Sequence, residues 1–276
     1  MWWELEKKMC KRIDKQISAS SANKKLVQGF SLTEVLMAVG VLSIGIMLVA
    51  TMFPAALYLT TVASEKTMAA IVADQAFAKM QLYGYVPQAA DGDGFVRYKF
   101  RMVDDEHKMD PNEFIYLVEG SGQPQYSWEA LCRKLNSDVN DMRYSVKLFV
   151  SRKTAPNLKY IRDFAEPNRS DWPLPIVAET EYQGQNRLKM KYGQGKYLNP
   201  PPSTTIVDYN SGRLFRIVSR EAGDIVILDR NWDRDINHPD EIWYVPSAVD
   251  PVDINEPFGN NPDIEVFQRI IDFKRN

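Results

Sequence analysis

The longest uninterrupted run of apolar residues lies near the start of the chain, between Phe30 and Phe53. These 24 residues contain one charged side chain, Glu34. A helix of this length rises about 36 Å, which is enough to cross a hydrocarbon core of about 30 Å. A single segment in lipid satisfies its backbone hydrogen bonds only as a helix. We therefore predict a transmembrane helix over 30–53.

The segment before this run is polar and basic. Residues 1–29 carry seven Lys or Arg side chains against three Asp or Glu. Positive charge flanking a membrane helix favours the cytoplasmic side, so we expect the amino terminus inside and the remaining chain outside. A cleaved secretory signal peptide is the alternative, but its apolar region runs about 7–15 residues, shorter than the run seen here. We therefore predict a single-pass membrane protein.

Beyond Pro54 the apolar residues continue with a different spacing. Over 60–83 they recur every three or four residues, which is typical of an amphipathic helix, and Gly84 and Pro87 end the pattern. We expect one N-terminal helical region over 30–85, with its second half forming a stalk that buries an apolar stripe. A β-sheet made by the downstream chain is the natural surface to cover that stripe.

The downstream chain, 86–276, reads as a β-rich head. Runs of β-branched and aromatic residues bounded by turn residues predict strands. These runs are 95–103, 114–118, 144–150, 174–178, 214–218, 225–228 and 242–245. We also predict a hairpin at Glu221–Asp224 and a short helix over 127–135 capped by Ser127, while 264–273 fits either strand or helix. The loop-rich range 152–203 either divides the head into two lobes or forms one long insertion.

These elements together predict an α+β fold. Its N-terminal helix, half membrane-spanning and half amphipathic, would pack on a mainly antiparallel β-sheet head. The 276-residue chain is long enough to bury a core of this kind.

The residues at the start of the apolar run form a recognisable motif. Gly29 is followed by Phe-Ser-Leu-Thr-Glu and then by the apolar segment. This junction resembles the N-terminal cleavage and methylation motif of type IV prepilins and type II secretion pseudopilins. The resemblance implies cleavage after Gly29, methylation of the new amino terminus at Phe30, and use of Glu34 in assembly. The stretch 41–46 is more similar to minor pilins and pseudopilins than to major pilins.

The resemblance also implies partners and a location. We expect other pilin or pseudopilin subunits, a prepilin peptidase that also methylates, and an inner-membrane assembly platform. In a bacterial cell the chain would reside in the inner membrane with its head outside the cytoplasm, and in a filament after assembly. It would be a minor pilin or pseudopilin of a type IV pilus or a type II secretion system.

The position of Glu34 in an apolar segment also has a physical explanation that does not depend on the resemblance. An ionised carboxylate in hydrocarbon costs several kcal/mol, so it needs a partner. In a stack of parallel helices, the cleaved amino terminus of a neighbouring subunit is a suitable cation, and such a pair fixes axial register. Ser31 and Glu34 also form an S-x-x-E capping box, which starts a helix near the headgroups. The two roles are compatible.

A second group of acidic residues invites a metal-site hypothesis. Six oxygen-bearing side chains occupy the first, third, fifth, seventh, ninth and twelfth positions of one segment, a spacing that suits Ca²⁺. They are Asp229, Asn231, Asp233, Asp235, Asn237 and Asp240. However, Arg234 stands where an EF-hand loop needs glycine, and Asp91–Gly94 is a weaker acidic cluster. We favour a solvated acidic loop and no metal or other cofactor, with calcium as the alternative.

Basic residues alternate with apolar ones at Arg187, Lys189 and Lys191, which places three cations on one face of a strand. A polyanion-binding surface is one interpretation; protection of an exposed edge strand is the one we favour.

The whole chain has 34 Lys and Arg against 36 Asp and Glu, a net charge of −2. This balance argues against nucleic acid as the main partner.

Catalysis finds little support in the sequence. With only two histidines and two cysteines in the whole chain, we expect no Cys/His zinc site. His107 and His238 lie in charged loops without a nucleophile motif, and Cys132 reads as a core residue. No phosphate-binding glycine loop is present. We expect no enzyme activity.

The alternative function is a single-pass anchored ectodomain that binds or cleaves a target without polymerising. A third possibility, a secreted enzyme, would need cleavage beyond residue 54.

Overall fold

The computed structural model describes residues 29–84, 94–98, 111–116, 125–138, 140–153, 155–162, 169–198, 204–233, 240–249, 257–258 and 262–273. Several predictions concern residues outside these ranges. They are the leader before Gly29, both histidines, Asp235, Asn237, and most of the Asp91–Gly94 cluster. The chain divides into two compact units, Met1–Thr60 and Thr61–Asn276.

The first unit contains the amino-terminal part of one long helix, α2 (Leu32–Tyr83). The carbonyl of Ser31 accepts the first helical hydrogen bonds, from the N–H groups of Glu34 at 2.9 Å and Val35 at 3.1 Å. The helix passes through Pro54 without a break. It is the one helix in the described chain that is long and apolar enough to cross a membrane.

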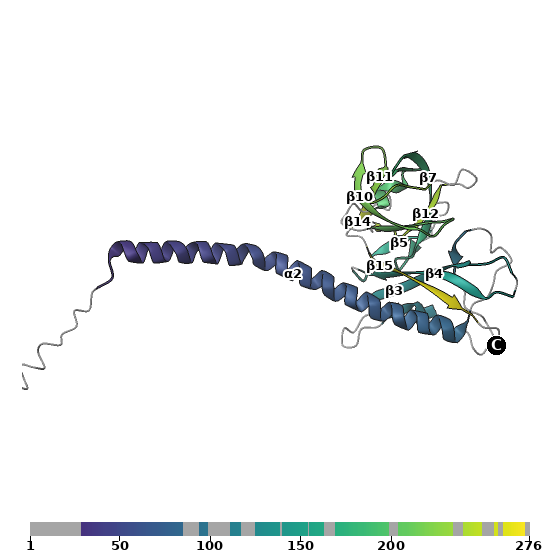
Figure 1. Ribbon diagram of the computed structural model, residues 1–276, viewed down its shortest axis with the longest axis horizontal. Helices are drawn as coiled ribbons and strands as arrows, with labels where there is room; N and C mark the ends of the chain where they lie inside the picture. Colours follow the sequence, from purple (N-terminus) through teal and green to yellow (C-terminus); the bar gives the residue numbers. More distant parts are fainter. Residues whose placement is uncertain are drawn as a thin grey trace, which may run out of the picture. The chain divides into compact units, whose positions relative to one another are not determined.

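The second unit begins with the last turns of α2 and an antiparallel sheet (Figure 1). Its strand order is β1-β3-β4-β15, and β2 pairs with the end of β3. The strands are β1 (Val96–Arg97), β2 (Ile115–Tyr116), β3 (Tyr126–Lys134), β4 (Arg143–Arg152) and β15 (Asp263–Asp272). A short 3-10 helix, η2 (Pro111–Phe114), precedes β2.

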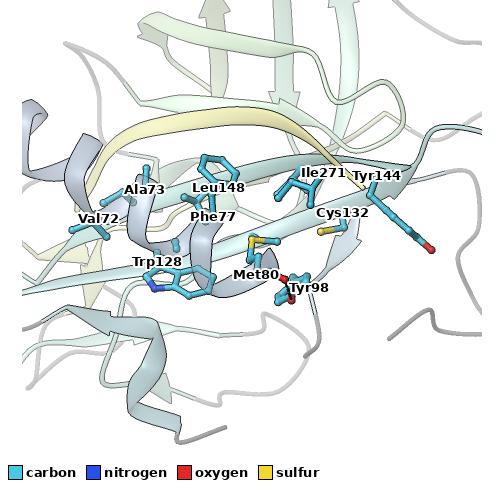
Figure 2. Close-up of a cluster of buried hydrophobic side chains, with 14 of the residues drawn as sticks. Val72, Ala73, Phe77, Met80, Tyr98, Trp128, Cys132, Tyr144, Leu148 and Ile271 are labelled. Atoms are coloured by element: carbon cyan, nitrogen blue, oxygen red, sulfur yellow. Dashed lines mark hydrogen bonds between the residues drawn. The ribbon is translucent and has the colours of Figure 1, made fainter. Parts of the chain in front are cut away.

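One face of this sheet packs on α2. Figure 2 shows Val72, Ala73, Phe77 and Met80 of the helix among side chains from the strands. The strand side chains of this cluster include Trp128, Cys132, Tyr144, Leu148 and Ile271. Every one of these side chains is at most 3% exposed, so the carboxyl-terminal part of α2 is an integral part of the head's core.

The second unit also contains a closed barrel of six antiparallel strands in the order β10-β11-β8-β7-β12-β9. They are β7 (Ile176–Gly184), β8 (Arg187–Met190), β9 (Thr205–Asp208), β10 (Leu214–Glu221), β11 (Ile225–Leu228) and β12 (Glu241–Tyr244). Buried side chains such as Leu188, Ile206, Phe215 and Tyr244 form its core. A 3-10 helix, η3 (Gln194–Tyr197), follows β8.

A small third sheet joins β5 (Lys159–Ile161), β6 (Arg169–Ser170), β13 (Ala248–Val249) and β14 (Pro257–Phe258). The barrel also shares a buried cluster with the other face of the long sheet. Phe95, Leu131 and Phe149 from the sheet side meet Val207 and Trp243 of the barrel. Among its described residues, the loop-rich range 152–203 holds the four strands β5 to β8, and β7 and β8 belong to the barrel.

The α+β prediction is confirmed by the long helix and the antiparallel sheets. The predicted hairpin is also confirmed, because Glu221 of β10 pairs with Ile225 of β11. Gly223 supplies the positive φ that this turn requires, +79°. The ambiguous 264–273 segment is strand β15.

The predicted helix over 127–135 is wrong: this segment is strand β3. Trp128, Ala130 and Cys132 belong to the core under α2, while Leu131 belongs to the cluster facing the barrel. A strand buried on both faces lacks the alternation of apolar and polar residues that identifies a strand from sequence. Packing against two neighbours therefore overrides the helical appearance of the segment.

Candidate functional site

The motif residues lie immediately before the start of α2. Gly29 and Phe30 precede the helix, and Phe30 is 81% exposed. A Cβ atom added to Gly29 would meet nothing within 4 Å in the described chain. The Gly29–Phe30 peptide bond is therefore sterically open, and substitutions at Gly29 leave the described contacts intact.

Glu34 lies in the first turn of α2 and is exposed. Ser31 behaves as an N-cap residue in its backbone, since its carbonyl accepts the first helical bonds. Its hydroxyl lies 2.7 Å from the hydroxyl of Thr33. The positive end of the helix dipole favours a carboxylate in this turn. The next charged residue along the chain is Glu65, so no cation within 30–64 is available to neutralise Glu34.

The helix around Glu34 is apolar on all sides. Large side chains from Leu32 to Leu59 are roughly half to three quarters exposed, whichever side of the helix they occupy. A helix of this kind is stable only in lipid or in the interior of an assembly. The first part of α2 therefore has the properties of a membrane-spanning and helix-packing segment.

The carboxyl-terminal part of α2 is fixed to the head by charge as well as by packing. Lys66 approaches Glu265 of β15 at 3.3 Å, and Asp74 accepts from Arg269 of the same strand at 3.0 Å. The other two pairs are Glu65 with Arg152 of β4 and Lys79 with Glu113 of η2. Exposed pairs of this kind contribute little individually, so the buried contacts of the helix supply most of its attachment to the sheet.

The acidic segment does not gather around a common point in the described residues. Asp229 accepts hydrogen bonds from the backbone N–H of Arg216 and from Arg230, and these bonds lower its pKa although burial opposes them. Asp233 pairs with Arg213 at 2.5 Å, and Asp240 accepts from the indole of Trp232 at 3.3 Å. Asn231 is exposed. Within the described ranges no three His, Cys, Asp or Glu side chains are placed to share a metal.

Arg187 and Lys189 of β8, and Lys191 directly after it, are exposed as the alternation predicts, but the edge-strand interpretation is wrong. β8 lies between β7 and β11 in the closed barrel and has no free edge. Arg187 pairs with Glu221, and Lys191 approaches Glu179 at 3.3 Å. Lys189 lies directly opposite Glu181. The positive charges therefore stabilise neighbouring strands by cross-strand pairing.

Cys132 is fully buried in the core beneath α2, as the sequence predicted. It is therefore inaccessible as a nucleophile. The sequence does not indicate that Lys147 and Asp263 of the head are buried, or that Glu129 is part-buried. Burial raises the pKa of Glu129 although the guanidinium of Arg97, 3.4 Å away, opposes this. No local pattern distinguishes these residues from exposed charges.

Comparison of the chain with protein-family models, with curated proteins and with solved structures finds no match.

Proposed function

We propose that this chain is a minor pilin or pseudopilin subunit of a type IV pilus or type II secretion system. It is processed after Gly29 and assembled through its hydrophobic helix. The observation that carries the proposal is the coincidence of three features. An exposed helix, apolar on all sides, begins two residues beyond the Gly29–Phe30 bond and carries one carboxylate in its first turn.

The proposal explains why Glu34 is tolerated in an apolar segment. Cleavage after Gly29 creates a new positive charge on the amino group of Phe30. When helices stack in parallel, this amine on one subunit neutralises Glu34 of its neighbour. A buried charge of this kind permits only registers in which it meets its partner, so the pair determines the axial step between subunits.

The proposal also assigns the remaining parts of the chain. The basic leader stays in the cytoplasm, where a prepilin peptidase removes it and methylates Phe30. The helix holds the subunit in the inner membrane until an assembly platform extracts it. The head, whose core includes the last turns of α2, remains outside the cytoplasm.

The first test is mass spectrometry of the mature amino terminus from cells that carry the full secretion or pilus machinery. We expect N-methylated Phe30. Gly29→Leu should leave the full leader in place, and because position 29 has free space around it, the folded head should be unaffected. A native chain that retains residues 1–29 would overturn the proposal and favour an anchored ectodomain that does not polymerise.

The second test separates insertion from assembly. Glu34→Gln keeps the size and helix propensity of the side chain but removes its charge. We expect normal membrane insertion with at least a tenfold loss of incorporation into sheared filaments or cross-linked oligomers. Asp74→Asn, which removes an exposed carboxylate from the head part of the same helix, is the matched control and should assemble normally. Equal incorporation of both variants would contradict the role of Glu34.

A further inference from the structure

Two cations lie beside one aromatic ring on the barrel-facing side of the long sheet. The guanidinium carbon of Arg133 on β3 is 5.2 Å from the centroid of Phe95, and the ammonium of Lys147 on β4 is 5.7 Å from it. Arg133 is paired with Ser145, and Lys147 with Leu131. One cross-strand pair, Cys132 with Val146, lies between these two, so the side chains of Arg133 and Lys147 are diagonal neighbours on the same face of the sheet.

The hydrogen-bond partners of both cations are neutral. Lys147 donates to the side-chain oxygen of Gln268 on β15 at 2.7 Å, and Arg133 donates to the backbone carbonyl of Asn210. Within the part of the chain that the structure describes, neither has a carboxylate at ion-pair distance. By contrast, Arg152 of β4 and Arg269 of β15 each have one.

Burial makes this arrangement costly. The side chain of Lys147 belongs to a residue that is 7% exposed, and burial together with the positive charge of Arg133 lowers its pKa. Like charges held close together in a poorly hydrated place repel each other strongly. Because β3 and β4 are paired along their whole length, the backbone holds both residues on one face of the sheet.

The surrounding structure keeps the two cations in place. The barrel turn at Gly212 is so close that an added Cβ would lie 2.1 Å from the Phe95 ring and 3.1 Å from Cε of Lys147. Gln268 accepts one hydrogen bond from Lys147, and the carbonyl of Asn210 accepts one from Arg133. An ammonium has three donors and a guanidinium five, so most of their donors remain for another acceptor.

We propose that Arg133 and Lys147 form a binding site for a small oxyanion, a carboxylate or a phosphoryl group. The guanidinium offers a planar pair of N–H donors that matches either group, and the ammonium supplies a second positive charge. Ser145, opposite Arg133 and part-buried on the same face, provides a hydroxyl. A bound anion supplies the negative charge that the described chain does not place there.

The test measures thermal unfolding of the full chain in neutral detergent, in sodium chloride, sodium acetate and sodium phosphate at equal ionic strength. We expect acetate or phosphate to raise the unfolding midpoint in a saturable manner. The more effective anion identifies the source as a carboxylate or as a phosphoryl group. Calorimetric titration with that anion should give a binding isotherm.

Lys147→Met removes the charge and keeps the aliphatic chain, so it should weaken anion binding at least tenfold and raise the midpoint in chloride alone. Lys189→Met, which removes an exposed cation of β8, is the matched control and should bind as the unmodified chain does. If Lys147→Met does not fold, Arg133→Gln replaces it, with the same expected loss of binding. Absence of any anion-specific shift, or an equal shift in the variants and the control, would overturn the proposal.

Discussion

Asp263 provides a pH-dependent test of how the barrel and the long sheet pack together. It begins β15 opposite Ser151 of β4, and 7% of its surface is exposed. Burial raises the pKa of its carboxyl to about 8, although a hydrogen bond from the backbone N–H of Thr205 on β9 opposes the shift. An unfolded aspartate titrates near pH 3.9. Between about pH 4 and 8 the folded chain therefore keeps a proton that the unfolded chain loses.

The sign and size of the effect follow from this difference in bound protons. The free energy of unfolding is greatest below the unfolded pKa of Asp263 and falls as pH rises toward its folded pKa. In this range the folded chain binds a proton that the unfolded chain releases, so a higher pH favours unfolding. One proton contributes a slope of about 1.4 kcal/mol per pH unit. Asp263→Asn removes the titrating group, so its free energy of unfolding relative to the unmodified chain should rise by about 2.5 kcal/mol from pH 5 to pH 7.

The assay is urea unfolding of the full chain in detergent at pH 5, 6 and 7, followed by tryptophan fluorescence. Only the difference between variant and unmodified chain is interpreted, because other groups titrate in both. Glu181→Gln, which removes an exposed carboxylate of β7, is the control. Parallel stability curves for Asp263→Asn and the unmodified chain would refute the reasoning, since they would mean that Asp263 is hydrated in the folded state.

Three further predictions test the packing and electrostatics of the head. Phe77→Ala opens a cavity in the core between α2 and the sheet and should lower the free energy of unfolding by about 3–5 kcal/mol, measured by urea unfolding. Gly212→Ala, at φ +68° and against the Phe95 ring, should destabilise by more than 1 kcal/mol in the same assay. Hydrogen bonds from Arg143 lower the pKa of Asp141 to about 2; Arg143→Gln should raise that pKa toward its ordinary value, followed by NMR titration.

The parts of the fold that could be predicted from sequence are those set by neighbouring residues. The apolar run of α2 is visible because one composition persists over many turns, and Ser31 marks its start. The β10–β11 hairpin is visible because its turn lies between two short runs of β-forming residues. In both cases the residues that form the element are neighbours in the sequence. A continuous apolar run is enough to indicate the helix, and a short turn between two strands is enough to indicate the hairpin.

The parts that escaped prediction depend on residues distant in sequence. The barrel closes through pairings such as β9 with β12, which no local pattern specifies. The pairing of β3 and β4 places Arg133 and Lys147 on one face, and their nearness to Phe95 depends on a third segment. The edge-strand interpretation of β8 failed for the same reason, because an alternating strand looks alike at an edge and inside a closed barrel.

The contrast between the two ends of α2 bears on how the proposed subunit assembles. From Ala69 to Met80 the helix contributes six buried residues to the head, while its large side chains from Leu32 to Leu59 are exposed. Transfer from lipid to a bundle of like helices changes the surroundings of the exposed part only. Because the head's core begins beyond that part, the head can remain folded during the transfer. In the proposed assembly, the free-energy difference between membrane and filament would therefore come from helix packing and from the neutralisation of Glu34. The proposal thus predicts that this single carboxylate controls assembly without affecting the fold.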